Sequence, residues 1–289
     1  MYPSQVSRAI EAASSIAAGL GLHVDDVVVV QNSNKLSLRL LPCDTFARVA
    51  PASHDHGALE VDLAQRLSES GCPVAALEPR VPPQPYRHDG FEVTFWTFYE
   101  TEDSTLSPSA HAGALQDLHA GMRSVDVSID RFTDRVDEAL RVVSDPEGSP
   151  TLAVDDRALL VAALDEASNA IGERSAPEQL LHGEPHVGNV LNTAVGPRFI
   201  DLETCRRGPV EFDLAHVPAV VSDFYPGIDA GLLSDCRRLV LAMVAAWRFE
   251  PDDQFPMGAA FGHALVDRLR ERPPWPTIDE VYRSVVAPS

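Results

Sequence analysis

The chain has 289 residues, of which 45% are hydrophobic, and its 23 Lys and Arg against 43 Asp and Glu give a net charge of −20. This length allows about two domains with real cores, and the composition excludes a disordered chain. The acidic balance argues against nucleic-acid or membrane-surface partners. The sequence shows no signal peptide, no apolar run long enough to cross a membrane and no CxxC pair, so we expect a cytoplasmic protein.

The first hundred residues are predicted to form a small lobe of strands and helices. Apolar residues recur at helical spacing over 4–20 and again over 57–70, where Gly71 and Pro73 end the second helix. Between these helices, three short β-prone runs separated by turn-like segments predict an antiparallel meander. The five predicted strands are Val27–Val30, Leu36–Leu41, Thr45–Ala50, Val74–Val81 and Glu92–Tyr99.

The rest of the chain is predicted to be mainly helical. A polar segment at 100–108 reads as a linker, and a broken segment at 181–203 holds one short strand, Arg198–Leu202. We therefore expect residues 1–100 to form an N-terminal lobe and residues 101–289 a larger helical lobe, in an α/β (α+β) bilobal fold. The predicted helices cover about 108–122, 128–143, 155–172, 228–249 and 256–272.

The segment LHGEPHVGNVL, residues 181–191, carries the most informative chemistry. Two glycines and a proline force an irregular loop, which presents the acid Glu184 and, five residues later, the amide Asn189. A second acid, Asp201, follows within FIDLE. Phosphoryl transfer uses a carboxylate near the attacking hydroxyl and oxygen ligands for Mg²⁺, and these residues supply that set.

The three blocks HGEPHVGNVL, FIDLE and GPVEFDLAH resemble the aminoglycoside phosphotransferase-like small-molecule kinases, also called the phosphotransferase enzyme family, which are relatives of choline kinases and protein kinases. The family pattern is HGDxxxxN, then IDxE or IDxD, then GxxxxDLA, and the blocks occur here in the same order and at similar spacing. The resemblance implies a protein-kinase-like fold. It also implies ATP- or GTP-dependent phosphorylation of a small-molecule hydroxyl, with Mg²⁺ as cofactor.

Carried over by the resemblance, Glu184 stands where the family has its catalytic Asp, and His182 matches the histidine that positions the catalytic segment. Asn189 and Asp201 match the Mg²⁺ ligands, and Glu203 matches a nearby second acid that assists metal or substrate. From the residues alone, Glu203 could instead pair with one of the arginines that follow it.

Further roles follow from the same resemblance. Asp213 resembles an acid that holds the catalytic loop through backbone hydrogen bonds, and Arg48 lies where the third strand carries a phosphate-pairing Lys, with Glu60 as its ion-pair partner. An ordinary surface ion pair is the alternative for Arg48 and Glu60. The nucleotide-binding residues expected in the turn and in the hinge strand are Asn32, Ser33 and Asn34, and Thr97, Phe98 and Tyr99.

Three departures from the family pattern stand out. Glu184 replaces Asp and moves the carboxylate by about 1–1.5 Å, which motivates the alternative of a catalytically impaired pseudokinase that binds nucleotide and acts through partners. Arg48 replaces Lys and offers a bidentate fork. The turn at 31–35 holds no glycine, so its side chains rather than its backbone would donate to phosphate.

Two metal-site alternatives are weaker. His182, Glu184 and His186 alternate, as ligands on a strand would, but the Gly and Pro between them oppose a regular strand. The segment 54–56, His-Asp-His, is a second metal candidate that reads better as a loop before a helix. The acidic larger lobe makes a cationic acceptor plausible, and we expect a monomer or homodimer.

Overall fold

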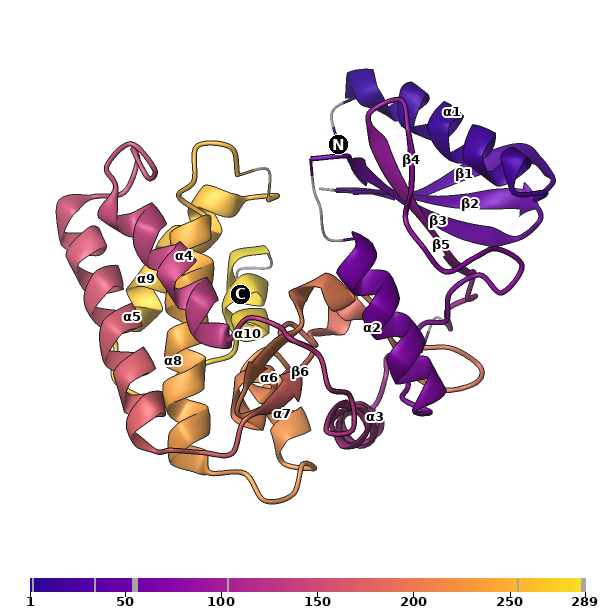
Figure 1. Cartoon of the computed structure of the whole chain (residues 1–289). Coiled ribbons are helices and arrows are strands. Elements are labelled where there is room, and N and C mark those ends of the chain that lie inside the picture. Colours follow the sequence, from indigo (N-terminus) through magenta and orange to yellow (C-terminus); the bar gives the residue numbers. More distant parts are fainter. Residues whose placement is uncertain (2, 34, 54–56, 103, 254, 287–289) are drawn as a thin grey trace. The chain divides into compact units, whose positions relative to one another are not determined.

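The computed structural model describes residues 1, 3–33, 35–53, 57–102, 104–253 and 255–286. Two compact units divide the chain, and each is described by itself. The first unit comprises Met1–Thr105 and Val190–Glu203, and the second comprises Leu106–Asn189 and Thr204–Ser289. The first unit is built on a sheet and the second is mainly helical (Figure 1), so the predicted α+β class is confirmed. The predicted lobe boundary at residue 100 stays a prediction.

An antiparallel five-stranded sheet forms the centre of the first unit (Figure 1). The first three strands pair in sequence, which confirms the predicted meander. In spatial order the strands are β1 (Val24–Asn32), β2 (Leu36–Pro42), β3 (Thr45–Pro51), β5 (Phe91–Thr97) and β4 (Tyr86–His88).

Helix α1 (Pro3–Gly19) covers one face of this sheet. Small residues such as Ala9 and Ala13 let the helix approach closely, and they share a core with Leu36, Leu38 and Leu40 of β2. Ala47 and Val49 of β3 are buried, and because side chains alternate across a strand, the residue between them points to the opposite face of the sheet. Arg48 is therefore directed away from the α1 core.

The run 74–81 is not a strand, so that prediction is wrong. It makes only isolated bridges, from Val74 to Phe199 and from Leu77 to Trp96. Proline lacks an N–H for a ladder, and Pro79 interrupts the run. Strand β4 forms after it and was not among the predicted strands.

Four short elements complete the part of the first unit that the structure describes. Helix α2 (Gly57–Glu69) follows the meander. The hairpin β7 (Val190–Leu191) and β8 (Arg198–Phe199) leads into the 3-10 helix η2 (Leu202–Thr204), whose last residue belongs to the second unit.

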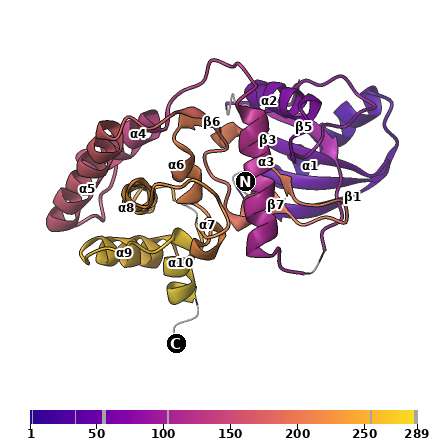
Figure 2. The same ribbon diagram turned by 90° about the horizontal axis from the view of Figure 1, so that it is seen from below.

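The second unit packs around helix α8. Figure 2 looks along α8, which contacts α4, α5, α6 and α9. The five predicted long helices are present, whereas α6, α7 and α10 were not predicted. The helices are α3 (Pro108–Met122), α4 (Phe132–Ser144), α5 (Val154–Glu173), α6 (Val210–Leu214), α7 (Ala219–Ser222), α8 (Ala230–Trp247), α9 (Gly258–Leu269) and α10 (Ile278–Val286), with the 3-10 helix η1 (Val187–Asn189) and the strand pair β6 (Gln179–Leu181) and β9 (Arg206–Gly208).

None of the described helices combines the length and the apolar character that crossing a membrane requires.

Candidate active site

The 182–189 loop lies in the second unit, directly after β6, and a buried carboxylate holds it. Asp213 of α6 is fully buried, and its oxygens accept hydrogen bonds from the backbone N–H groups of His182 (2.9 Å) and Gly183 (2.8 Å). This is the backbone tether that the sequence predicted for Asp213. Neither N–H belongs to a helix or a strand, so the acid supplies partners that secondary structure does not.

Gly183 is required at its position. Its φ of +90° lies in the left-handed region, and a Cβ there would collide with the carbonyl oxygen of Thr204. Thr204 in turn donates from its hydroxyl to the carbonyl of His182 at 2.9 Å. The glycine thus lets two backbone segments approach closely.

Sequence reasoning missed the histidine that completes this tether. His119 of α3 is fully buried, with Nε2 2.9 Å from Oδ2 of Asp213 and Nδ1 2.8 Å from the hydroxyl of Tyr225. Burial would raise the pKa of Asp213, but the hydrogen bonds that it accepts from His119 and from the N–H of Gly183 outweigh burial and lower the pKa. Asp213 therefore remains a carboxylate that accepts all of these hydrogen bonds.

Glu184, the predicted catalytic acid, is paired with an arginine that the sequence did not single out. Arg135 of α4 places Nη2 2.7 Å from Oε1 of Glu184, and the two side chains are 14% and 23% exposed. The guanidinium lies 4.6 Å from the ring centroid of Trp247, at the end of α8. A planar guanidinium can pair with a carboxylate and stack on an aromatic ring at once, so Arg135 ties Glu184 to two helices.

Next to this pair lies a buried imidazole. His216 is 4% exposed, and its Nε2 has no hydrogen-bond partner among the described residues. Burial lowers the pKa of His216 to about 4, although the charges of Glu184 and Asp213 act in the opposite direction. His216 is therefore neutral at pH 7.

Asn189 ends η1 and is 8% exposed. Its Nδ2 donates to the carbonyl of Glu184 at 3.0 Å, which fixes the amide. With the nitrogen as donor, Oδ1 remains as the atom that can coordinate a cation. His182, Glu184 and Asn189 are thus gathered in one short loop, as the sequence predicted.

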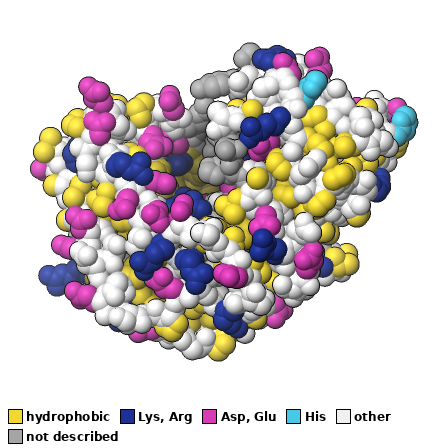
Figure 3. Space-filling model, viewed as in Figure 1, with side chains coloured by type: hydrophobic (Ala, Val, Ile, Leu, Met, Phe, Trp, Pro, Cys, Tyr) yellow, Lys and Arg dark blue, Asp and Glu magenta, His cyan; other side chains and the backbone are white. Residues whose placement is uncertain are grey.

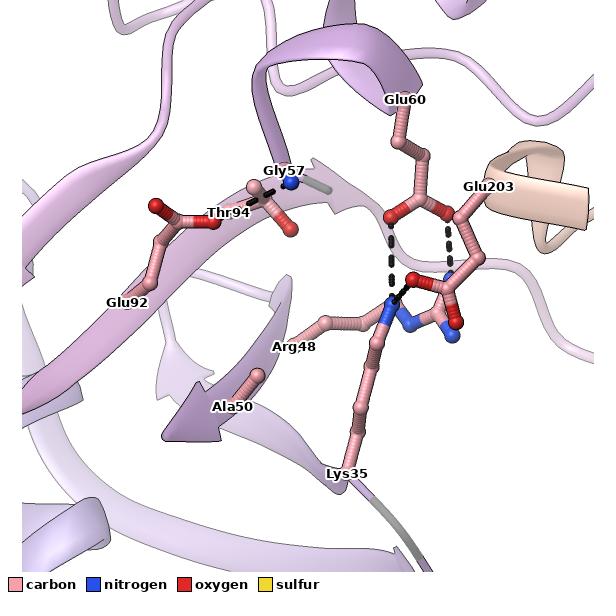
Figure 4. Close-up of a pocket in the computed structure, with 8 residues that line it drawn as sticks. All are labelled: Lys35, Arg48, Ala50, Gly57, Glu60, Glu92, Thr94 and Glu203. Carbon is pink, nitrogen blue, oxygen red and sulfur yellow. Dashed lines mark hydrogen bonds and ion pairs between the residues drawn. The ribbon is translucent and has the colours of Figure 1, made fainter. Parts of the chain in front are cut away.

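The Arg48 pocket, which is lined by Lys35, Arg48, Ala50, Gly57, Glu60, Glu92, Thr94 and Glu203, lies within the first unit (Figure 4). Nη1 of Arg48 lies 2.5 Å from Glu60, and Nη2 lies 2.7 Å from Asp201. The Glu60 side chain is only 2% exposed, so its contact with Arg48 is not an ordinary surface ion pair. The predicted partner of Arg48 is therefore correct.

Two backbone features shape this pocket. Gly57, the first residue of α2, donates its N–H to Glu92 at 3.2 Å, and the Glu92 carboxylate occupies the space that a Cβ would fill. Asp201 adopts a φ of +70°, a left-handed conformation that is uncommon for residues other than glycine. Such strain is found at functional sites, and here it accompanies the acid that contacts Arg48.

Electrostatics keep Arg48 charged. Burial would lower its pKa, but the carboxylates of Glu60 and Asp201 outweigh burial and raise it. Burial also raises the pKa of Glu60, against the opposing effect of Arg48 and Lys35. The pocket thus holds a permanent cation.

Glu203 pairs with Lys35 at 2.5 Å, where the sequence offered a metal or substrate role, or a pair with Arg206 or Arg207. Lys35 is the cation of this pocket that sequence reasoning missed. One signal was present, because Lys35 is the only lysine in the chain.

The predicted nucleotide residues of the turn and the hinge strand lie as follows. Asn32 ends β1, and both Asn32 and Ser33 are exposed, whereas Asn34 is outside the described residues, as is the segment 54–56. Thr97 ends β5, and its N–H donates to Ala76 at 2.9 Å. The ring of Phe98 lies under Arg39 at 3.9 Å, and the hydroxyl of Tyr99 accepts a hydrogen bond from the N–H of Ala76.

The residues fit Mg²⁺ in their chemistry. Asp201 and Glu203 supply carboxylate oxygens and Asn189 an amide oxygen, which are the donors that Mg²⁺ prefers. Among the described residues, no group of three or more His, Cys, Asp or Glu could hold a metal by itself. This agrees with Mg²⁺ sites in which one or two protein ligands act together with substrate phosphates. It also gives no support to a metal site at His182, Glu184 and His186, whereas the other His-based candidate, the segment 54–56, lies outside the described residues.

Comparison with solved structures shows the fold. The chain is similar to an amicoumacin kinase in complex with AMP-PNP, Ca²⁺ and Ami, with 11% identity, a TM-score of 0.72 and coverage of 97% of this chain and 100% of that chain. A spectinomycin phosphotransferase in complex with ADP and spectinomycin gives 13% identity, a TM-score of 0.63 and coverage of 94% and 98%. A choline/ethanolamine kinase family protein from Mesorhizobium loti gives 18% identity, a TM-score of 0.60 and coverage of 95% of this chain and 98% of that chain.

Comparison at the level of sequence shows the family. No curated protein matches the chain. The sequence profile of the phosphotransferase enzyme family, however, matches residues 24–255. This range includes the whole 182–189 loop, Asp201, Asp213 and the Arg48 pocket. The chain therefore belongs to the phosphotransferase enzyme family, as the sequence motifs had indicated.

Proposed function

We propose that this protein transfers the γ-phosphoryl group of ATP or GTP to a hydroxyl group of a small molecule. The observation that carries the proposal is the Arg48 pocket. One half-buried cation there joins an acid of α2 to the acid that follows β8, at 2.5 Å and 2.7 Å. A cation fixed between two carboxylates keeps its charge and its orientation, which suits it to bind phosphate.

Glu184 is the proposed catalytic residue. A carboxylate at this position would accept the proton of the acceptor hydroxyl as the hydroxyl attacks. Its pairing with Arg135 sets the direction of the longer side chain, so the extra methylene need not leave the carboxylate loosely placed. His182, whose N–H bonds Asp213, is proposed to hold the loop rather than to move a proton.

Asp201 and Asn189 are the proposed ligands of Mg²⁺, and Glu203 is proposed as an assisting acid. When bound there, Mg²⁺ would supply positive charge that offsets the negative charge of the phosphates during transfer. Asp201 is paired with Arg48 in this structure, so binding the cation would require this carboxylate to exchange or share its partner.

The acceptor is proposed to be a small hydroxyl compound, of which a cationic, aminoglycoside-like molecule is one class. Residues 101–289 hold 31 acidic and 16 basic residues, which supports a cationic acceptor. On the face of the helical unit seen in Figure 3, acidic side chains are interspersed with basic ones. The net charge therefore supports the class only weakly, because fold and charge do not define a substrate.

We do not favour the alternative of a pseudokinase. It was motivated by the Glu at position 184, and the 182–189 loop keeps a carboxylate there, held by an ion pair and 23% exposed.

Nucleotide binding is the first test. Titration calorimetry with Mg²⁺ and ATP or GTP should show binding, and Arg48→Met should weaken it about 30-fold, because charged hydrogen bonds to phosphate are lost. Arg8→Met is the matched control, since Arg8 is an exposed arginine of the same unit, on α1, and pairs with Asp89 at 2.9 Å. Wild-type protein that binds neither nucleotide, with or without Mg²⁺, would contradict the proposal. Phosphoryl transfer to a panel of hydroxyl compounds then identifies the acceptor.

A further inference from the structure

Lys35 differs from the other basic residues of the chain in its residue type and in its position. All the other 22 basic residues of the chain are arginines. Lys35 lies immediately before β2, and its side chain is 12% exposed. Figure 4 shows the side chain pointing into the Arg48 pocket, toward Glu60 and Glu203. Placing an ammonium group away from water is unfavourable unless it is paired, so we consider what this one does.

The ammonium of Lys35 shares a partner with Arg48. Its Nζ lies 2.5 Å from Oε2 of Glu203 and 3.6 Å from Oε2 of Glu60, while the other oxygen of Glu60 is held by Arg48. The two cations therefore lie side by side across one buried carboxylate. This arrangement places two positive groups in the same small pocket.

The way each cation is held distinguishes Lys35 from Arg48. A guanidinium has five N–H donors in a rigid plane, and two carboxylates fix the plane of Arg48, Glu60 at Nη1 and Asp201 at Nη2. An ammonium has three N–H donors, and of its two carboxylate partners only Glu203 is within hydrogen-bond distance. Within the part of the chain that the structure describes, Lys35 therefore has one close partner and can turn its other donors toward an added anion.

The positive charges of Lys35 and Arg48 together offset most of the negative charge of the carboxylates around them. Lys35 and Arg48 face Glu60, Asp201 and Glu203, so with all five ionised the cluster carries a net charge of −1. Without Lys35 the balance would be −2. A polyphosphate approaching such a cluster would meet stronger repulsion at short range.

We propose that Lys35 is a phosphate-binding residue and shares with Arg48 the role that the family resemblance assigns to the third strand alone. Arg48, while it holds Glu60 and Asp201 in place, binds the nucleotide phosphates, and Lys35 donates to a further oxygen of these phosphates. The inference rests on the proposed function, because it requires a nucleoside triphosphate in the Arg48 pocket.

A series of ligands with zero to three phosphate groups tests this role. Titration calorimetry compares adenosine, AMP, ADP and ATP, with Mg²⁺, on the wild type and on Lys35→Met. We expect ATP to bind about tenfold more weakly to the variant, the value of one charge-assisted hydrogen bond, while the affinity for adenosine changes less than about twofold. Lys35→Arg, which keeps the charge, should recover most of the affinity. Arg66→Met, an exposed cation on α2, is the matched control.

The single lysine allows a second, covalent readout. An acyl phosphate ester of ATP carries an activated carbonyl on its γ-phosphate. The deprotonated amine of Lys35 would attack this carbonyl, forming a C–N bond and breaking the acyl C–O bond, so that ATP leaves and the nitrogen loses a proton. Mass spectrometry should find the acyl group on Lys35, and excess ATP with Mg²⁺ should suppress it. Lys35→Arg, a chain without lysine, controls for labelling elsewhere.

The outcomes separate the two proposals. If the wild type binds ATP but Lys35→Met weakens ATP and adenosine equally, or not at all, Lys35 has only a structural role and the inference is wrong while the proposed function stands. If Lys35 stays unlabelled in a protein that binds ATP, the inference is likewise overturned. If the wild type binds no nucleotide, the proposed function itself fails. Thermal melting of Lys35→Met and Lys35→Arg confirms that both fold.

Discussion

The 182–189 loop and the Arg48 pocket both depend on a buried carboxylate, but in different ways. Asp213 accepts backbone N–H groups and an imidazole, so it determines the path of the main chain. Glu60 faces two cationic side chains, so it determines where positive charge lies. Substitutions that disrupt the 182–189 loop should therefore alter stability and turnover, whereas substitutions in the Arg48 pocket should alter the binding of anions.

The largest effect is expected at Glu184. Replacing it by Ala should lower kcat about 1000-fold, because general-base catalysis contributes on that order, and should leave the Kd of ATP within about twofold. Glu184→Asp should recover part of kcat, because a shorter acid keeps the charge but loses its fit to Arg135. Steady-state kinetics with an identified acceptor, together with calorimetry, measure both quantities.

Glu178→Ala is the matched control, since Glu178 also pairs with an arginine of the second unit, Arg131. If the kcat of Glu184→Ala equalled that of the wild type, the catalytic assignment would be wrong. If it lost nucleotide affinity instead of kcat, the contrast between the loop and the pocket would not hold.

Asp213→Asn should destabilise the protein by about 3 kcal/mol, since it disrupts a fully buried charged network. Asn offers one acceptor oxygen, and its NH₂ would face an N–H donor of the loop. The lowered pKa of Asp213 means that its stabilisation is present at neutral pH and is lost as pH falls through the folded-state pKa. Urea unfolding at pH 7 measures the loss, and an unchanged unfolding midpoint would refute the role of this tether.

His216 gives an effect that is small at neutral pH and grows as pH falls. The unfolded chain binds a proton on this imidazole below about pH 6.5, whereas the folded protein does so only below about 4. Between these values the unfolded state holds more protons, so stability falls as pH drops, by up to about 3 kcal/mol at pH 4. Urea unfolding of His216→Leu from pH 7 to 4 should show a flatter pH dependence. A slope equal to that of the wild type would contradict the buried neutral imidazole.

Much of the fold was predictable because its signals are local. The meander at 24–51 follows from β-prone runs and turns, and the long helices follow from apolar periodicity. The wrong strand at 74–81 has the right apolar content but contains Pro79, and its backbone makes only two isolated bridges. The short helices α6 and α7 have too few residues to show a period.

The sequence by itself placed Glu184 and Asn189 in one irregular loop, because only five residues separate them, and the resemblance to the family assigned Asp213 to the same loop. Only the tertiary structure decided their partners. Arg135, His119 and Lys35 lie 49, 94 and 168 residues from Glu184, Asp213 and Glu203, and no local pattern relates such distant positions. Buried charges must be neutralised by whichever groups folding brings near them, so these pairings emerge only once the helices and the sheet have packed.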